Sequence, residues 1–146
     1  MTDQNQPAPP SRPFPGHLAV EATLRDTDLV GHVNNGVYLN WFEEVRTRYV
    51  VDRIGRMAAG EISFIMASAT LNFRSPVQML EVVDLYCGPV RVGNKSWELV
   101  YEFRARSDGR LVCEGSSVQV QYDYGAGCTV PLADDWRSRF EEDLAK

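Results

Sequence analysis

One helix-length apolar stripe stands alone in a chain whose remaining pattern is typical of strands. Large apolar side chains recur in it at intervals of three and four residues: Tyr38, Trp41, Phe42, Val45 and Tyr49. This spacing predicts the buried face of an amphipathic helix of several turns. Asn34 and Asn35 precede the stripe as candidate N-cap residues, and Gly55 follows it as a candidate end. A helix this apolar has to be covered, and other elements must supply the cover.

Alternation of apolar and polar residues predicts about five strands around that helix. The first runs from Leu18 to Leu24, and further strands are expected over 82–86, 96–106 and 111–122. The remaining strand follows the helix and contains two apolar sets of opposite phase, which we expect to face opposite sides of the sheet. These sets are Ile62, Phe64 and Met66, and then Ile65, Ala67, Ala69, Leu71 and Phe73.

Turn and helix signals complete the predicted order of elements. Asp108-Gly109 predicts a hairpin that joins the strand expected over 96–106 to the one over 111–122. Trp136, Phe140 and Leu144, spaced by four, predict a short C-terminal helix. The order is therefore one strand, a long helix, about four strands and a short helix, which favours an α+β fold.

A single antiparallel sheet curling around the long helix would cover its apolar face. Small residues in two strands, Ala67-Ser68-Ala69 and Gly115-Ser116-Ser117, would allow a close approach. Such a sheet leaves an edge and an outer face, which homodimerisation commonly covers. We expect residues 16–146 to form this single domain. The proline-rich residues 1–15 bury too little apolar surface to order themselves and are expected to form a flexible tail.

Composition narrows the functional classes. The chain has 146 residues and a net charge of −5, so one acidic domain is expected, which is a poor general binder of nucleic acid. Cys87, Cys113 and Cys128 form no Cys-x-x-Cys motif and are expected to be reduced thiols. No apolar run is long enough to span a bilayer, and the first residues do not have the pattern of a signal peptide. We therefore expect a cytoplasmic protein that does not bind membranes.

A ten-residue motif before the helix carries a family resemblance. The stretch Asp26-Thr27-Asp28-Leu29-Val30-Gly31-His32-Val33-Asn34-Asn35, followed by Tyr38, Trp41, Glu44 and Arg46, resembles the acyl-CoA thioesterases of the hotdog fold. More narrowly, it resembles the branch related to 4-hydroxybenzoyl-CoA thioesterase. Phe73-Arg74-Ser75-Pro76 and Val92-Gly93-Asn94-Lys95-Ser96 agree with it, and the resemblance covers roughly Val20 to Phe140.

The resemblance implies an antiparallel sheet wrapped around the central helix and a homodimer as the minimum unit, often a homotetramer built as a dimer of dimers. It also implies hydrolysis of an acyl-CoA or acyl-carrier thioester. No cofactor is expected, because coenzyme A is part of the substrate.

Asp28 is the leading catalytic candidate. It lies a few residues ahead of the predicted helix, whose first N–H groups have no intrahelical partner. Those N–H groups and the positive end of the helix dipole suit an oxyanion, so a carboxylate and an oxyanion donor could meet at one substrate. The resemblance implies the same roles, with Asp28 as the catalytic carboxylate and the backbone N–H of Asn35 as the oxyanion donor. Direct attack by Asp28 and activation of a water both remain open.

Three further residues are weighed as catalytic groups. His32 titrates near neutrality, but ordering the loop or contacting substrate is the more expected role. Asn34 is expected either to cap the helix or to hydrogen-bond the acyl carbonyl. Glu44 is the reserve catalytic carboxylate, and an ion pair with Arg48 four residues on is its more expected role. Asp26 is expected to cap a turn or to form an ion pair.

Substrate-binding candidates come from the chemistry of coenzyme A. Its phosphates need a local basic group, and Arg74, Arg91 and Lys95 lie at predicted strand ends or turns. Tyr38 could stack on an aromatic acyl group, although a place in the core is the more expected role.

Other site classes fit less well. With two histidines and no Cys/His cluster, a metal site is not expected. Serine-nucleophile, phosphate-loop and dinucleotide glycine motifs are missing from the sequence. A hotdog hydratase is disfavoured because Asn34 is followed by Asn35 and Gly36, not by the Pro-x-His of that class. A non-catalytic module that binds acyl-CoA or an acyl carrier, with the same fold, remains the alternative function.

Overall fold

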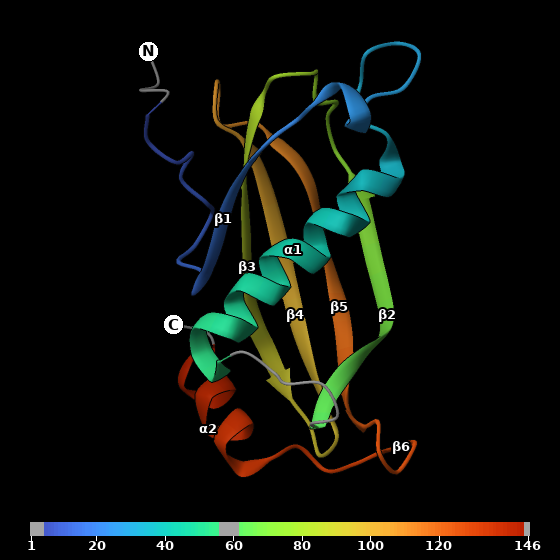
Figure 1. Ribbon diagram of the computed structural model, residues 1–146. Helices are drawn as coiled ribbons and strands as arrows, with labels where there is room; N and C mark the ends of the chain where they lie inside the picture. The colour runs from blue at the N-terminus through green and yellow to red at the C-terminus, as the bar shows by residue number, and fades with distance from the viewer. Residues whose placement is uncertain (1–4, 56–61, 145–146) are drawn as a thin grey trace.

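A single antiparallel sheet wraps around one long helix in the computed structural model, which describes residues 5–55 and 62–144 (Figure 1). The sheet order is β1-β3-β4-β5-β2, and the two-residue β6 pairs with β5. The elements are β1 (Gly16–Glu21), a short 3-10 helix η1 (Leu24–Asp26), α1 (Asn35–Ile54), β2 (Ile62–Phe73), β3 (Val82–Val92), β4 (Ser96–Ala105), β5 (Leu111–Asp123), β6 (Cys128–Thr129) and α2 (Asp134–Glu142). The predicted α+β arrangement is confirmed. The first strand is shorter than predicted and stops before η1.

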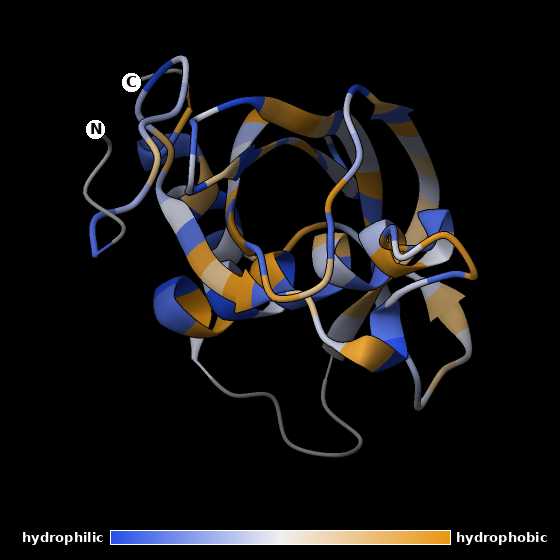
Figure 2. Cartoon of the chain, turned by 90° about the horizontal axis from the view of Figure 1, so that it is seen from above, coloured by the Kyte–Doolittle hydropathy of each residue, from blue (hydrophilic) through white to orange (hydrophobic). Residues whose placement is uncertain are grey.

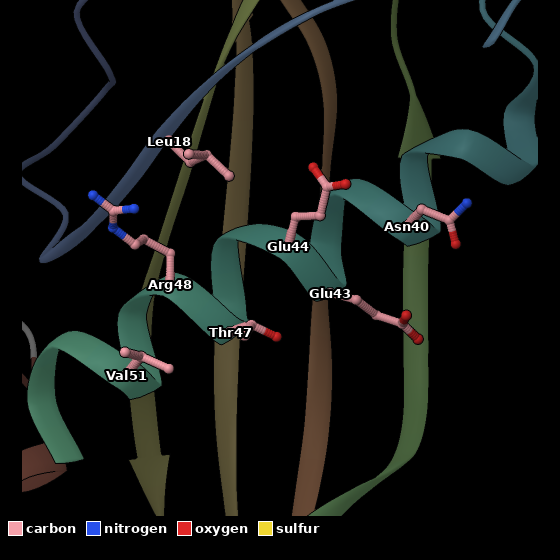
Figure 3. A pocket seen from close by; sticks show the side chains of 7 residues that line it. All are labelled: Leu18, Asn40, Glu43, Glu44, Thr47, Arg48 and Val51. Atoms are coloured by element: carbon pink, nitrogen blue, oxygen red, sulfur yellow. The ribbon is translucent and has the colours of Figure 1, made fainter. Parts of the chain in front are cut away.

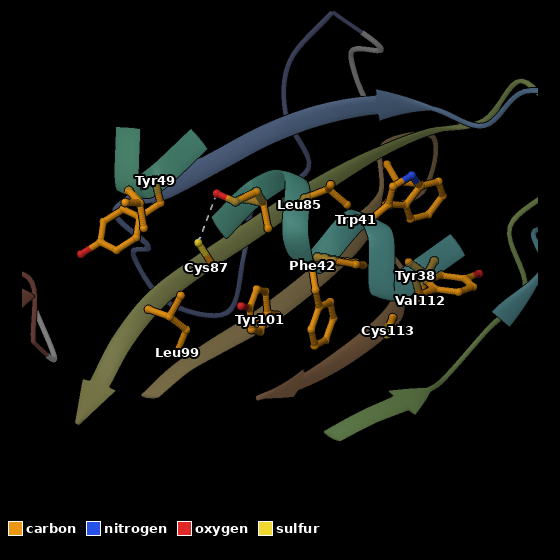
Figure 4. Close-up of a cluster of buried hydrophobic side chains, with 14 of the residues drawn as sticks. Tyr38, Trp41, Phe42, Tyr49, Leu85, Cys87, Leu99, Tyr101, Val112 and Cys113 are labelled. Atoms are coloured by element: carbon orange, nitrogen blue, oxygen red, sulfur yellow. Dashed lines mark hydrogen bonds between the residues drawn. The ribbon is translucent and has the colours of Figure 1, made fainter. Parts of the chain in front are cut away.

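Helix α1 crosses the concave face of the sheet with its predicted apolar stripe buried (Figures 1 and 4). The ring of Phe42 stacks on Tyr101 of β4 with centroids 3.9 Å apart and meets Phe103 edge-on. Gly115 on β5 permits this approach, because a Cβ there would overlap the carbonyl oxygen of Thr70 and stand 3.1 Å from Phe42. One of the two predicted small-residue stretches therefore does bring the helix and the sheet together.

A β-bulge in β2 changes which of its residues face the helix. The register against β5 shifts between Met66 and Ser68. Residues opposite each other in an antiparallel pair share a face, and one extra residue reverses the phase of everything beyond it. Residues of both apolar sets of β2 therefore reach the helix side, where they lie opposite the inward residues of β5: Phe64 and Met66 before the bulge, and Ala69, Leu71 and Phe73 after it. Ile65, which lies before the bulge and pairs with Val120, faces the other side as predicted. The prediction of opposite faces was wrong for the part of the second set beyond the bulge.

Hydropathy follows the strand alternation elsewhere in the sheet (Figure 2). On β4, Trp97, Leu99, Tyr101 and Phe103 are all buried toward the helix. At the lower end of the sheet α2 packs Trp136 and Phe140 against Trp97, as its spacing predicted. The hydroxyl of Tyr49 donates to Asp143, which ties the end of α1 to α2. No helix in the described part of the chain is both long and apolar enough to cross a membrane.

The segment before β1 lies on the outer face of the sheet. The backbone N–H of Ala8 donates to Asp84, and the Tyr86 hydroxyl donates to the carbonyl oxygen of Ala8. Farther along, both the backbone N–H and the hydroxyl of Ser11 donate to Glu102. These contacts of residues 8–11 differ from the flexible tail expected from composition, because outward polar groups of β3 and β4 bind its backbone directly.

Asp84 is the buried centre of that outer-face network. Burial alone would raise its pKa, but hydrogen bonds from His17, Arg106 and the Ala8 N–H lower that pKa to about 2. A carboxyl whose pKa is lower in the folded than in the unfolded chain stabilises the fold above its unfolded pKa and loses that contribution as pH falls.

We expect Asp84 to make the stability of the protein acid-sensitive between about pH 4 and pH 2. Protonating Asp84 should remove about 2 kcal/mol of unfolding free energy across that window, because the folded pKa lies below the unfolded one. Urea unfolding across this range should show that loss in wild type and a smaller one in Asp84→Asn. Glu43→Gln, which removes an exposed carboxyl, should keep the wild-type loss. An unchanged pH dependence in Asp84→Asn would contradict the prediction.

Candidate active site

The loop between β1 and α1 holds the carboxylate of Asp28 in a defined orientation. Its Oδ1 accepts hydrogen bonds from the backbone N–H of Val30 at 2.9 Å and of His32 at 3.1 Å. The Asp28 N–H donates to the carbonyl oxygen of His32, and Gly31 has φ +80°, a left-handed conformation that glycine adopts without strain. Within the described chain Oδ2 forms no hydrogen bond, so this oxygen is the one available for chemistry.

Asn34 caps the helix, and the cap determines which N–H group is left for a ligand. Its side-chain oxygen accepts from the Gly36 N–H at 3.0 Å, and its carbonyl oxygen accepts from the Val37 N–H at 2.9 Å. Among the first three N–H groups of α1, the N–H of Asn35 is the one with no acceptor in the described residues. The capping role expected for Asn34 is present. An N–H group at the positive end of a helix is suited to an oxyanion.

Replacing Asn34 by alanine should lower the unfolding free energy by about 1 kcal/mol, because the Gly36 N–H loses its side-chain acceptor. Asn34→Ser should recover most of the loss, since serine is an equally good N-cap residue. Denaturant unfolding of both variants measures this difference. Equal stability of the alanine and serine variants would show that the cap does not act as proposed.

Asp28 and Asn35 line one hollow of about 320 Å³. Residues from the loop, from the start of α1 and from the segment after β2 share it: Asp28, His32, Val33, Asn35, Tyr38, Phe73, Arg74, Ser75 and Pro76. A backbone bridge between Thr27 and Val33 closes the loop on itself, and a bridge between His32 and Gln78 holds it against the segment that leads into β3. The loop that carries Asp28 and the start of the helix at Asn35 therefore border the same small space.

The other two candidate residues of the loop, His32 and Asp26, help to order its backbone. The backbone of His32 orders the Asp28 turn, as expected, and the residue lines the hollow. Asp26 accepts from the backbone N–H and hydroxyl of Thr23 and so caps η1. The turn-capping role expected for Asp26 is confirmed.

Tyr38 and Arg74 line the hollow, and the side chain of each also contacts other residues of the protein. The ring of Tyr38 packs edge-on against Trp41 and Phe73, and burial raises its pKa to about 12, so its hydroxyl stays protonated. Arg74 donates from Nε and Nη2 to Glu114 at 3.1 and 2.8 Å. Tyr38 is thus a core residue that also forms a wall of the hollow, and Arg74 is an exposed cation at its rim.

The end of β3 and the hairpin after it, where the sequence places Arg91 and Lys95, lie at the opposite end of the sheet from the loop before α1 (Figure 1). The Asp28 loop contacts the segment just before β3, whereas Arg91 stands near the end of β3 and Lys95 in the following hairpin. Eleven residues of strand span about 33 Å, so one chain does not bring these two cations to the hollow.

Glu44 lines a separate and larger hollow of about 950 Å³ on the solvent side of α1 (Figure 3). Glu43 and Arg48 share it, and Arg48 pairs with Asp52 at 3.4 Å where an ion pair with Glu44 was the expectation. N–H groups in the middle of a helix are used by the helix itself, so this hollow has no free backbone N–H like that of Asn35, although the side chains of Asn40, Thr47 and Arg48 line it. The chemistry therefore points to the smaller hollow.

No pattern in the sequence places Phe73, Val33 and Pro76 around Asp28. Phe73 reaches the helix side through the bulge in β2, which no local pattern predicts.

The two buried thiols, Cys87 and Cys113, do not line the hollow and supply no nucleophile to it. Burial raises the pKa of Cys87 well above its usual range and that of Cys113 to about 12. In the described residues, no group of three His, Cys, Asp or Glu side chains is placed to hold a metal ion.

An antiparallel sheet wrapped around one long helix is the hotdog fold. The family described as the thioesterase-like superfamily matches residues 22–140, so the chain belongs to this superfamily and is a hotdog-fold thioesterase. Its fold matches a predicted thioesterase from Bacillus stearothermophilus with a TM-score of 0.82, at 23% identity over 89% of this chain and 96% of that one.

Two other relatives carry functional names. The long-chain acyl-CoA thioesterase FadM of Escherichia coli (strain K12) is 24% identical over 117 residues, which cover 79% of this chain and 89% of FadM. A thioesterase from Thermus thermophilus, solved with coenzyme A and zinc, is 28% identical with a TM-score of 0.76, and the match covers 88% of this chain and 94% of that one.

Proposed function

We propose that the protein hydrolyses an acyl-CoA thioester to a carboxylic acid and free coenzyme A, with Asp28 and the Asn35 N–H as its catalytic groups. The observation that carries this proposal is the shared hollow, which is lined both by Asp28, whose Oδ2 forms no hydrogen bond within the described residues, and by Asn35, whose N–H at the helix start has no acceptor there. The similarity to FadM, an acyl-CoA thioesterase, and to a thioesterase solved with coenzyme A supports this substrate class.

The same two groups serve both routes of thioester cleavage. As a general base, Asp28 Oδ2 takes a proton from a water while the water oxygen attacks the carbonyl carbon. As a nucleophile, Oδ2 attacks that carbon itself and forms a mixed anhydride that water then hydrolyses. In either route the carbonyl oxygen gains negative charge beside the Asn35 N–H, and the C–S bond breaks to release the thiolate of coenzyme A.

Supporting roles follow from the positions of the neighbouring residues. His32 contacts substrate from the wall of the hollow, Tyr38 forms its apolar side, and Arg74 at the rim binds a phosphate of coenzyme A. Glu44 stays the reserve carboxylate. Because Arg91 and Lys95 lie far from Asp28 within one chain, any contact they make with the same coenzyme A requires a second copy.

A homodimer, and a tetramer as a dimer of dimers, are part of the proposal. Strand β2 stands at one end of the sheet order and pairs with β5 alone among the described strands. Its twelve residues leave one row of backbone groups available for pairing with another chain. Light scattering of the purified protein would give the mass of the assembly.

The test of the function is thiol release from short, long and aromatic acyl-CoA thioesters and from an acyl-carrier thioester. Release from at least one member at a rate far above the uncatalysed one would support the proposal. Tight binding of acyl-CoA in a calorimetric titration, with no release from any member, would replace it with the non-catalytic binding module.

A further inference from the structure

The hydroxyl group of Tyr38 forms no hydrogen bond within the described residues, and the residue is 3% exposed. Buried polar groups are nearly always paired, so this hydroxyl needs an explanation. Its oxygen is not one of the polar atoms of the described interior that are both unpaired and sealed from solvent. It therefore opens onto space, and the space that Tyr38 borders is the hollow that it lines with Asp28 and Asn35.

The packing of the Tyr38 ring holds the hydroxyl in one place. Trp41 and Phe73 meet the ring edge-on, with centroids 5.2 and 5.3 Å away. Figure 4 shows the hydroxyl at the outer end of the ring, pointing away from Phe42 and the middle of the core. The apolar part of the side chain therefore belongs to the core, and its polar end belongs to the hollow.

The segment after β2, which forms another wall of the hollow, leaves this hydroxyl available for a ligand. The carbonyl oxygen of Pro76 accepts from Arg110 at 2.8 Å, and the Ser75 hydroxyl donates to the carbonyl oxygen of Leu111 at 2.6 Å. These bonds tie the wall to the start of β5 and not to Tyr38. Burial raises the pKa of Tyr38 to about 12, so its hydroxyl keeps a proton to donate.

The carbonyl oxygen of the proposed substrate has room for a second donor. It carries two lone pairs, and the cap by Asn34 leaves the Asn35 N–H as the free one among the first three N–H groups of α1, as far as the described chain shows. A substrate that fills the hollow displaces its water, so the Tyr38 hydroxyl then either bonds the substrate or stays unpaired at a cost. The side chains of His32 and Asn35 are more exposed and keep access to water.

The position of Tyr38 on α1 directs its hydroxyl toward the same end of the helix as the Asn35 N–H. Tyr38 lies three residues after Asn35, and residues at this spacing share a helix face. Long side chains on a helix lean toward its N-terminus, so Tyr38 covers the turn in which Asn35 stands. The N–H groups of a helix point toward that end too. Both donors are thus directed to the part of α1 that borders the hollow.

We propose that the Tyr38 hydroxyl is a catalytic group, which donates a hydrogen bond to the thioester carbonyl oxygen beside the Asn35 N–H. This inference rests on the proposed function, because it takes the thioester to lie between Asp28 and the start of α1. The bond strengthens as attack on the carbonyl carbon places negative charge on the oxygen, and it weakens again when the C–S bond breaks. The tyrosine keeps its proton throughout.

Tyr38→Phe tests this role by removing one oxygen atom while keeping the ring that packs on Trp41 and Phe73. We expect kcat for the best acyl-CoA substrate to fall about a hundredfold with KM little changed, because the donor acts mainly in the transition state. The loss should be similar for every acyl group that wild type hydrolyses, since all of them share the carbonyl oxygen. Unchanged kcat, or a loss confined to acyl groups that carry a polar substituent, would overturn the proposal.

Unfolding measurements and a matched variant separate a catalytic role of the hydroxyl from a structural one. A hydroxyl without a protein partner contributes little to the fold, so Tyr38→Phe should unfold at the same denaturant concentration as wild type. Tyr124→Phe makes the same chemical change at an exposed tyrosine outside the hollow and should keep the wild-type kcat. A clearly destabilised Tyr38→Phe, or an equal loss of kcat in Tyr124→Phe, would contradict the assignment.

A ketone analogue separates this inference from the proposed function. In the ketone analogue of myristoyl-CoA a methylene group lies between the carbonyl carbon and the sulfur, so there is no thioester to cleave. Hydrogen bonds lower the stretching frequency of a carbonyl group, and infrared spectra of the bound, isotope-labelled analogue should show a lower frequency in wild type than in Tyr38→Phe. That difference without hydrolysis of any thioester would retain the Tyr38 donor and reject the catalytic proposal. Hydrolysis by wild type with equal carbonyl frequencies in the two proteins would do the reverse.

Discussion

Replacement of Asp28 by asparagine is expected to lower kcat for acyl-CoA hydrolysis by about a thousandfold and to leave the fold unchanged. The amide oxygen of asparagine still accepts from the N–H groups of Val30 and His32, so the turn that holds the side chain persists. The amide nitrogen that replaces Oδ2 neither takes a proton from water nor attacks a carbonyl carbon, so both routes lose their essential group. Thiol release under saturating substrate measures the loss.

Asp26→Asn is the matched control for this experiment. It makes the same chemical change two residues away, at a carboxylate that caps η1 through Thr23. We expect its kcat to stay close to that of wild type. Full activity in Asp28→Asn, or an equally large loss in Asp26→Asn, would remove Asp28 from the catalytic role.

Gly115→Ala should produce the largest loss of stability from a single added methyl group. A Cβ at this position would overlap the carbonyl oxygen of Thr70 on the paired strand, and backbone cannot move aside as a flexible side chain would. The same Cβ would press on Phe42, which is stacked on Tyr101 at the centre of the core. We expect the unfolding free energy to fall by about 3 kcal/mol, measured by denaturant unfolding.

Gly36→Ala is the control for that substitution. Gly36 lies in the first turn of α1, is exposed, and has only the Asn34 side-chain oxygen within 4 Å of an added Cβ, at 3.6 Å. Alanine is the better helix former, so this variant should gain up to about 1 kcal/mol. A Gly115→Ala protein as stable as wild type would mean that β2 and β5 separate easily at this point.

The predicted helix and the position of Asp28 show which features of the structure a local sequence pattern can predict. The stripe from Tyr38 to Tyr49 has a single period, and the Asn34 cap is a local hydrogen bond, so both follow from neighbouring residues. The relation between Asp28 and Asn35 is local for the same reason, because seven residues and a turn separate them. The side of the sheet on which the later residues of β2 lie was predicted wrongly, because a bulge shifts their register. That shift depends on pairing with β5, which is a distant segment of the chain.

The buried polar residues of the interior show the same division more strongly. Arg46 belongs to the motif before and within the helix, and Gln119 is a polar position in a strand, but nothing local indicates that either is buried. Their burial depends on how α1 crosses the sheet and on how β2 aligns with β5. No spacing rule relates residues that are more than seventy positions apart.

The sequence by itself determined the class of fold, the central helix with its cap, and the loop that carries the catalytic candidate. These rest on periodicity and on short-range hydrogen bonds, which act between residues close in the chain. Only the tertiary structure decided that residues of both apolar sets of β2 face the helix, that the segment before β1 docks on Asp84 and Glu102, and that Arg91 and Lys95 lie far from Asp28. Each of these depends on strand register and on the packing of distant segments, which the energies of neighbouring residues do not specify.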